Sequence, residues 1–390
     1  MSVLDALSRE LGEARVGSSP GMDGRVRPGS GEELAAALRV LAAGGASAVV
    51  RGSGSWDALG HPMPRARILL ETTGLLGEVQ VDGEDGVAHL PAGASVSSLG
   101  EHVRKETGGA WELPFDPASS SSTLGGCLAT ASPGFRFGHP RDVVLGLEIA
   151  LATGERVRCG GRVVKNVTGY DLAKLYVGSL GTLGVIEAAW IRLLPAPEKT
   201  ECWWVPLADP SQAVEPARLP SARAAAWLSA GLAREIPKPG AGMILELAGD
   251  APAVAADAEF LGRQYAADPT DPAGLGLVRA MRGKDPGVRV RVSARPSKLK
   301  ESIAGLSNAG AEILAQPARG LVWAFASDEA VVEVAGSAGD GFLVEAAPLA
   351  VRESRELFGE NPALRPLQAA LKAQYDPAGT LNPGRFAGRI

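Results

Sequence analysis

Three short runs of glycine and small hydroxyl residues stand out in this sequence, and runs of this kind can bind phosphate groups. They are Arg51-Gly52-Ser53-Gly54-Ser55-Trp56, Thr123-Leu124-Gly125-Gly126 and Gly181-Thr182-Leu183-Gly184-Val185-Ile186. Glycine lets backbone amides approach a ligand closely, and Ser and Thr hydroxyls suit phosphate oxygens. The runs therefore predict a cradle for a large phosphate-bearing cofactor.

The first run follows a predicted buried strand at residues 46–50, so a Rossmann dinucleotide loop has to be considered. That fingerprint needs a third glycine where Asp57 stands and a helix after it. The following Ala58-Leu59-Gly60-His61-Pro62 is predicted to be loop. The amides of the run could still bind a pyrophosphate, and taken alone the run is equally compatible with a plain surface turn.

Few side chains are candidates for catalysis, and the catalytic residue itself is not identified. His139 stands in a predicted turn, where it could meet the cofactor or be an ordinary solvated or capping residue. Arg289 and Arg291 alternate along a predicted strand at 288–292 and so share one face. They could clamp a carboxylate, or form salt bridges on a solvated sheet face. Lys165 could bind a phosphate or cap the next helix.

Composition narrows the class of protein. The 390 residues are 45% hydrophobic and 21% charged, with a net charge of −5, which argues against a nucleic-acid partner. The three cysteines are far apart and lack C-x-x-C spacing, so we predict no metal site. The N-terminus does not read as a signal peptide, and the most apolar window, residues 34–50, contains Arg39 and a Gly44-Gly45 break. We therefore expect a cytoplasmic protein without a transmembrane segment.

Strand and helix signals predict an α+β protein of more than one domain. Residues 1–197 alternate strands and helices, and Pro195-Ala196-Pro197 marks a boundary. From residue 288 the predicted order is β-α-β-β-α-β, which is ferredoxin-like, and a degraded copy precedes it. We expect residues 198–346 to form a cap domain and residues 347–390 to return to the first domain.

These motifs together resemble the FAD-binding domain of the vanillyl-alcohol oxidase superfamily, whose fold is called PCMH-type. The resemblance rests on the second and third runs, on Arg141-Asp142-Val143-Val144-Leu145-Gly146, and on the closing Asp376-Pro377-Ala378-Gly379-Thr380-Leu381-Asn382-Pro383-Gly384-Arg385. Within the superfamily, Leu113-Pro114-Phe115 and Lys165-Asn166-Val167-Thr168-Gly169-Tyr170-Asp171 are most similar to the FAD-binding E subunits of bacterial glycolate oxidases.

The resemblance implies a position for each part of the FAD site. Arg51 to Trp56 would wrap the pyrophosphate, and Thr123 to Gly126 with Ser132 and Gly134 would approach the diphosphate and flavin. Residues 181–186 would line the adenine and ribose side, and Asn382 would lie near the flavin ring. Superfamily members that bind flavin covalently often carry a histidine where this chain has Ser55 and Trp56. We therefore predict a non-covalent FAD.

The resemblance also implies a function, an FAD-binding subunit of a complex that oxidises glycolate or another small 2-hydroxy acid. Its partners would be a second FAD-linked oxidase subunit and an iron–sulfur subunit, and the complex could attach peripherally to the inner membrane. All four histidines precede residue 140, whereas related dehydrogenases carry histidines in the cap. Either another residue serves as the base, or the chemistry belongs to a partner. A free-standing FAD oxidoreductase and a non-catalytic scaffold subunit remain alternatives.

Overall fold

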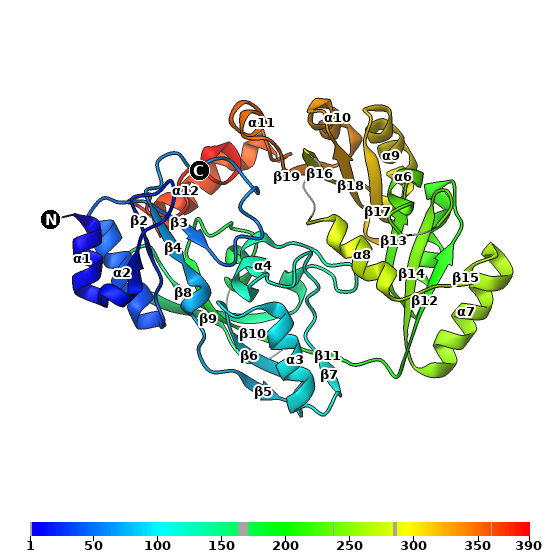
Figure 1. The fold of residues 1–390 in the computed structure, drawn as a ribbon, viewed down its shortest axis with the longest axis horizontal. Coiled ribbons are helices and arrows are strands. Elements are labelled where there is room, and N and C mark those ends of the chain that lie inside the picture. The colour runs from blue at the N-terminus through cyan, green and yellow to red at the C-terminus, as the bar shows by residue number, and fades with distance from the viewer. Residues whose placement is uncertain (1, 163–170, 237, 284–286, 360) are drawn as a thin grey trace.

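A computed structural model describes residues 2–162, 171–236, 238–283, 287–359 and 361–390, which build two neighbouring sheet systems (Figure 1). The first begins with a small sheet of order β1-β2-β4-β3, in which β2, β4 and β3 run parallel. Its strands are β1 (Val16–Gly17), β2 (Gly24–Val26), β4 (Ile68–Glu71) and β3 (Ala48–Arg51). The first glycine run begins at the end of β3 in this sheet.

Helix α2 (Gly31–Ala43) covers this sheet together with α1 (Val3–Leu11). Ser30 caps α2 by accepting a hydrogen bond from the Glu33 amide, and Gly44 ends the helix. Leu34, Leu38 and Leu41 are fully buried. Each such burial contributes about 1.5–3 kcal/mol to folding.

An antiparallel sheet of order β5-β6-β10-β8-β9 lies beside the small sheet and carries the other two runs on its connections. Helices α3 (Val96–Glu106) and α4 (Leu124–Thr130) pack on it in one hydrophobic core. A short pair of β11 (Leu194–Pro195) and β7 (Trp111–Glu112) lies next to it. The five strands are β5 (Gln80–Asp82), β6 (Val87–Pro91), β10 (Val185–Arg192), β8 (Val144–Ala150) and β9 (Arg156–Gly160).

The second system is an eight-stranded sheet of order β15-β12-β14-β13-β17-β18-β16-β19. Its second half, in chain order β16-α9-β17-β18-α10-β19, is the expected ferredoxin-like unit. Its first half repeats the strand arrangement, but short turns at 210–218 replace the first helix, so the expected degraded copy is present. The strands are β15 (Asp268–Pro269), β12 (Lys199–Val205), β14 (Gly242–Gly249), β13 (Ala222–Leu228), β17 (Glu312–Gln316), β18 (Leu321–Ala326), β16 (Val288–Ser293) and β19 (Gly341–Ala346).

The two faces of the eight-stranded sheet have different neighbours. Helices α7 (Ala251–Tyr265), α9 (Leu299–Asn308) and α10 (Ala330–Ala338) cover one face. The other face packs against α8 (Ala273–Met281) and Phe135 of the first system. This second face therefore looks toward the loop of the first system that follows α4.

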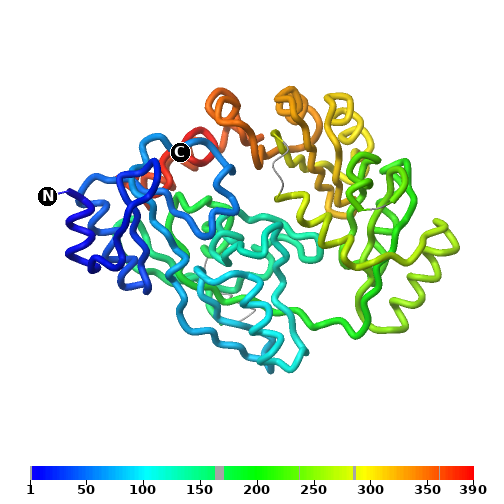
Figure 2. Tube along the Cα trace, in the orientation of Figure 1, coloured from blue at the N-terminus to red at the C-terminus, as the bar shows by residue number. Residues whose placement is uncertain are grey.

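The C-terminal segment returns to the first system, where the red end of the trace lies beside the blue start (Figure 2). Leu381 pairs with Ala48 as a parallel bridge, and the Asn382 amide donates to the Ala48 carbonyl at 2.9 Å. Helices α11 (Leu349–Ser354) and α12 (Arg365–Tyr375) precede this contact. No helix among the described residues is long and apolar enough to cross a bilayer.

One expectation needs correction. Arg289 and Arg291 do share a face of β16, but that face is the one that packs toward the first system, and it is not solvated. Arg289 is 6% exposed, and both guanidinium groups lie beside the buried carboxylate of Glu345. The predicted alternation of side chains along the strand is confirmed. The sequence of the strand alone could not show which part of the protein packs against the face that carries the two arginines.

Candidate functional site

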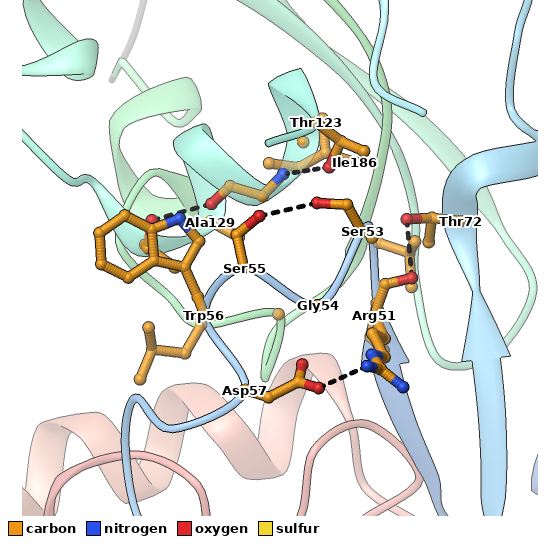
Figure 3. Close-up of a pocket in the computed structure, with 18 of the residues that line it drawn as sticks. Arg51, Ser53, Gly54, Ser55, Trp56, Asp57, Thr72, Thr123, Ala129 and Ile186 are labelled. Carbon is orange, nitrogen blue, oxygen red and sulfur yellow. Dashed lines mark hydrogen bonds and ion pairs between the residues drawn. The ribbon is translucent and has the colours of Figure 1, made fainter. Parts of the chain in front are cut away.

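The three glycine runs meet around one cavity (Figure 3). The cavity joins the two sheets of the first system. Of the predicted residues, those that line it are Arg51, Gly52, Ser53, Gly54, Ser55, Trp56, Thr123, Gly125, Gly126, Gly181, Gly184, Val185 and Ile186. Each of the three runs therefore forms one wall of the cavity.

The first wall is the loop that leaves β3, residues 52–56. Within the described part of the chain, its backbone amides make no hydrogen bond, and the buried indole Nε1 of Trp56 also has no partner. Arg51 reaches across the loop to Asp57 at 2.8 Å, and Ser53 and Ser55 hydroxyls lie 2.9 Å apart. Free amides on a cavity wall suit the oxygens of a diphosphate.

Gly52 keeps this wall close to the second. A Cβ at Gly52 would lie 2.3 Å from Thr123 Oγ1, so any side chain there would collide. The requirement for glycine at this position is one of space, because the loop and the start of α4 nearly touch.

The second wall differs from the expected cradle of amide donors. The Leu124 and Gly125 amides donate to the carbonyls of Ala94 and Ala92 at 3.0 and 2.8 Å, and the Gly126 amide donates to Thr123 Oγ1 at 3.1 Å. These amides are therefore used within the fold, and Gly125 allows α4 to pack closely against Ala92, 3.0 Å from where a Cβ would lie. Leu124 itself is buried in the core behind the cavity.

The third wall is the turn into β10. Leu180 and Gly181 both adopt positive φ angles, 53° and 70°, which bend the backbone along the cavity. Thr182 does not line the cavity, because its hydroxyl donates to the Ser179 carbonyl at 2.7 Å within the turn. Val185 and Ile186 are the first residues of β10 and close this side.

The C-terminal segment ties the first and third walls together. Asn382 is fully buried, and its Oδ1 accepts from the Val50 amide at 2.8 Å while its Nδ2 donates to the Leu180 carbonyl at 2.7 Å. Asn382 is thus placed behind the cavity, where both ends of its side chain are engaged. It positions the two loops that form the walls.

Arg385, the last residue of the closing motif, also lines the cavity. Its guanidinium donates to the carbonyls of Leu59 and Trp56 at 3.1 and 2.9 Å. Burial lowers the pKa of Arg385 to about 10, and the nearby charge of Asp57 partly opposes this shift.

Ser132 and Gly134 belong to the contact with the eight-stranded sheet. The Ser132 hydroxyl accepts from Arg282 at 2.8 Å, and the Gly134 carbonyl accepts from Arg319 at 2.7 Å and from Gln316 at 2.9 Å. Neither residue lines the cavity. Lys165 lies outside the described residues.

The weak catalytic candidates come together at this same contact. Arg291 lies on the sheet and His139 ends the loop that begins after α4. His139 is exposed, yet partial desolvation, and then the charge of Arg291, lower the pKa of His139 below its ordinary value. The charge of Arg291 therefore influences His139, although the two residues are far apart in the sequence.

Comparison with known proteins identifies part of the chain. Residues 22–160 match the family model of an FAD binding domain. The chain is 34% identical over 173 residues to a D-lactate dehydrogenase of Archaeoglobus fulgidus, covering 44% of this chain and 38% of that protein. It is also 34% identical over 180 residues to the glycolate oxidase subunit GlcD of Bacillus subtilis, covering 45% and 38%. This chain thus spans less than two fifths of the length of these relatives.

Solved structures share the fold over nearly the whole chain. The structure is similar to p-cresol methylhydroxylase with a TM-score of 0.76 at 16% identity, covering 98% of this chain and 96% of that one. A 4-ethylphenol oxidase from Gulosibacter chungangensis gives a TM-score of 0.73 at 15% identity, with the same coverage. The expected α+β fold of PCMH type and the expected FAD cofactor are confirmed. Residues 22–160 are therefore an FAD-binding domain, set in a chain that has the fold of p-cresol methylhydroxylase.

Proposed function

We propose that this chain is the FAD-binding subunit of an oxidoreductase of the glycolate oxidase type, which oxidises a small 2-hydroxy acid. One observation carries the proposal, the row of unpartnered amides at residues 52–56 on the wall of the cavity. A flavin dinucleotide offers diphosphate oxygens to such a row, and when bound it supplies an acceptor for two electrons and a hydrogen.

The residues of the three walls would divide the work of holding FAD. Amides of the 52–56 loop and the unpartnered Trp56 Nε1 would donate to the cofactor. Gly181 and Gly184 would allow close approach on the third wall, and Arg385 would add a positive charge. None of the described residues that line the cavity is a histidine, which supports a non-covalent FAD. Acid precipitation should therefore release the yellow colour into the supernatant, and a yellow pellet would contradict this.

The substrate class follows from the relatives. Their names specify D-lactate, glycolate and D-2-hydroxyglutarate, which are all 2-hydroxy acids. We propose glycolate, with glyoxylate as product, as the first substrate to test. D-Lactate is the main competitor, since its dehydrogenase is equally similar.

The partners are proposed from the same similarity. One relative is named as a glycolate oxidase subunit, which supports a complex with a second FAD-linked oxidase subunit and an iron–sulfur subunit. We further propose a cytoplasmic location, with peripheral attachment to the inner membrane in the assembled complex. Co-purification of a tagged chain from a fractionated cell extract tests both points.

Anaerobic reduction separates this function from its competitors. The FAD-loaded chain is mixed with glycolate or D-lactate without oxygen, with and without its co-purified partners. Reduction that requires the partners supports the subunit, whereas full reduction by the chain alone supports a free-standing oxidoreductase. A chain that binds FAD and is not reduced under either condition would be a scaffold, and the proposed oxidation would be wrong.

A further inference from the structure

The cofactor cavity is lined by charged side chains as well as by free amides. In the part of the chain that the structure describes, the ionisable residues that line it are Arg51, Asp57 and Arg385. Arg51 Nη2 lies 2.8 Å from Asp57 Oδ2, and this ion pair spans the loop that begins at the end of β3 (Figure 3). A carboxylate is therefore part of the same wall whose amides would bind a diphosphate.

The loop is shaped for this contact. The Asp57 amide donates to the Gly54 carbonyl at 3.2 Å, which closes a turn. Gly54 has a φ of 84°, and a Cβ there would lie 2.5 Å from Arg51 Nη2, so the guanidinium group passes directly over this glycine. The Thr72 hydroxyl donates to the Arg51 carbonyl at 3.2 Å and fixes the start of the loop. The pair is therefore a built feature of the wall.

Both members of the pair are accessible to a ligand. The side chain of Arg51 is 40% exposed and that of Asp57 is 50% exposed. An ion pair this exposed contributes little to folding stability. Hydrogen bonds from a guanidinium group to phosphate oxygens are charge-assisted and can be bidentate, and they rank among the strong ones. A bound diphosphate is thus a better partner for Arg51 than Asp57 is.

Arg51 is the one cation that contacts the Asp57 carboxylate within the described residues. The guanidinium groups of Arg385 and Arg352 instead donate to backbone carbonyls of residues 56–60. Burial raises the pKa of Asp57, and the charges of the three arginines oppose that shift. If Arg51 turned to a ligand, the carboxylate would lose its contacting cation and would repel a neighbouring anion.

We propose that Arg51 exchanges the carboxylate of Asp57 for the diphosphate of FAD, so that Asp57 acts as an internal competitor that limits FAD affinity. The inference rests on the FAD site of the proposed function and goes beyond it, because one residue of the cavity wall opposes the cofactor. Without this carboxylate, the two lining arginines would match the two negative charges of the diphosphate. Asp57 thereby keeps FAD exchangeable, in agreement with the non-covalent FAD proposed above.

Titration of the apoprotein with FAD tests the exchange. Asp57→Asn keeps the shape of the side chain and removes its charge, and it should bind FAD about threefold to tenfold more tightly than the wild type. Arg51→Gln should bind FAD about tenfold to a hundredfold more weakly, because the diphosphate loses charge-assisted donors. The matched control is Asp340→Asn, which removes the carboxylate of an exposed pair with Arg295 outside the cavity and should bind FAD as the wild type does.

Riboflavin and salt separate an effect of charge from a change of loop shape. Riboflavin has no diphosphate, so Asp57→Asn and Arg51→Gln should leave its affinity within about twofold of the wild-type value. Raising the salt from about 0.05 M to about 0.5 M should shrink the gain in FAD affinity of Asp57→Asn, because salt screens the repulsion between exposed charges. A gain of the same size for riboflavin, or one that salt does not change, means a rearranged loop and overturns the proposal.

The opposite result for Asp57→Asn also decides the question. If this variant binds FAD no better than the wild type, or more weakly, Asp57 positions Arg51 or binds the cofactor itself, and the proposed competition is wrong. Failure of the proposed function gives a different pattern. If neither glycolate nor D-lactate reduces the FAD-loaded protein while Asp57→Asn still binds FAD more tightly, the oxidation is wrong and the exchange stands.

Discussion

At the scale of single residues, the cavity depends on the absence of side chains as much as on donors. Gly52 leaves room for Thr123, and Gly181 has a φ of 70° with Asn382 Nδ2 2.9 Å from where its Cβ would be. The amides that remain unpartnered belong to residues 52–56. Sequence patterns identify such glycines, but they do not separate a glycine that exposes an amide from one that makes space.

Gly52→Ala should weaken FAD binding by about tenfold to a hundredfold. The added methyl would lie 2.3 Å from Thr123 Oγ1, and relieving such overpacking costs about 1–3 kcal/mol. Titration of the apoprotein, followed by quenching of FAD fluorescence, measures the effect. Gly100→Ala, at a helix position with open space around it, should leave FAD affinity unchanged. Equal affinities in the two variants would contradict the steric account.

Glu345 should make the protein sensitive to acid. Its folded-state pKa is lowered, so its stabilising contribution is complete above the unfolded pKa and is lost as pH falls through the folded pKa. Glu345→Gln should reduce the free energy of unfolding at pH 7 by about 3–5 kcal/mol, because buried arginines lose their partner, and it should flatten the acid dependence. Urea unfolding at several pH values measures both effects. Glu301→Gln, which removes an exposed pair with Lys298, is the control and should keep the acid dependence of the wild type. If Glu345→Gln also loses stability with acid as steeply as the wild type, the assignment to Glu345 is wrong.

At the scale of elements, the C-terminal segment holds the FAD loop from outside. Arg385 donates to two loop carbonyls, Arg352 donates to Gly60 at 2.9 Å, and the ring of His61 lies 3.2 Å from Glu356. The segment thus binds the carbonyls of Trp56, Leu59 and Gly60, while the amides of residues 52–56 have no partner among the described residues. This arrangement orients the donors before a ligand arrives.

Arg385→Ala should loosen the loop and reduce FAD affinity by at least about tenfold. The carbonyls of Trp56 and Leu59 lose their donor, and each hydrogen bond to a charged group is worth about 1.5–3 kcal/mol. Hydrogen exchange should accelerate in residues 52–60. Arg389→Ala, which removes an exposed arginine from the same segment, should change neither quantity. Loss of affinity without faster exchange would mean that Arg385 acts only through its charge.

The sequence predicted most of the helices and strands, but it predicted less well which of them pack against each other. The ferredoxin-like order from Val288 to Ala346 follows from local periodicity, and so does the helix start at Ser30. The burial of Arg289 does not follow from local periodicity, because its side of β16 packs toward a loop about 150 positions earlier in the chain. In the same way, the bonds of Asn382 to Val50 and Leu180 depend on a return of the chain that local signals cannot place.

At the scale of the whole molecule, ion pairs join the FAD domain to the eight-stranded sheet, and Arg136 with Glu246 and Arg223 with Glu112 are two of them. Arg136 follows the Ser132–Phe135 loop, and its Nε and Nη2 contact the two carboxylate oxygens of Glu246 at 2.7 and 2.5 Å. Glu246 is 3% exposed, and the bidentate hydrogen bond raises the pKa of Arg136. The pair therefore links the loop after α4 to strand β14 of the eight-stranded sheet.

Arg136→Ala should destabilise the protein by about 3–5 kcal/mol, since it leaves a buried carboxylate unpaired. Urea unfolding measures this loss, and limited proteolysis reports separation of the two halves. Arg263→Ala removes an exposed helical pair with Glu259 and should cost less than about 0.5 kcal/mol. Similar effects of the two substitutions would mean that the Arg136 pair does not hold the halves together.

The identity of the cofactor was predictable from the sequence because three runs and one closing motif each carry local signals. The contact between the eight-stranded sheet and the loop after α4 was not predictable, because its residues, such as Arg319 and Gly134, are far apart in the sequence and share no motif.

The account depends above all on the cavity being built for a flavin that carries a diphosphate. Titration of the apoprotein with FAD and with riboflavin tests this most directly, since riboflavin has the same ring and no phosphate. We predict saturation at one FAD per chain and binding of riboflavin at least about a hundredfold weaker, because the amides of residues 52–56 would lose their acceptors. Riboflavin binding as tight as that of FAD, or no binding of FAD, would contradict the account.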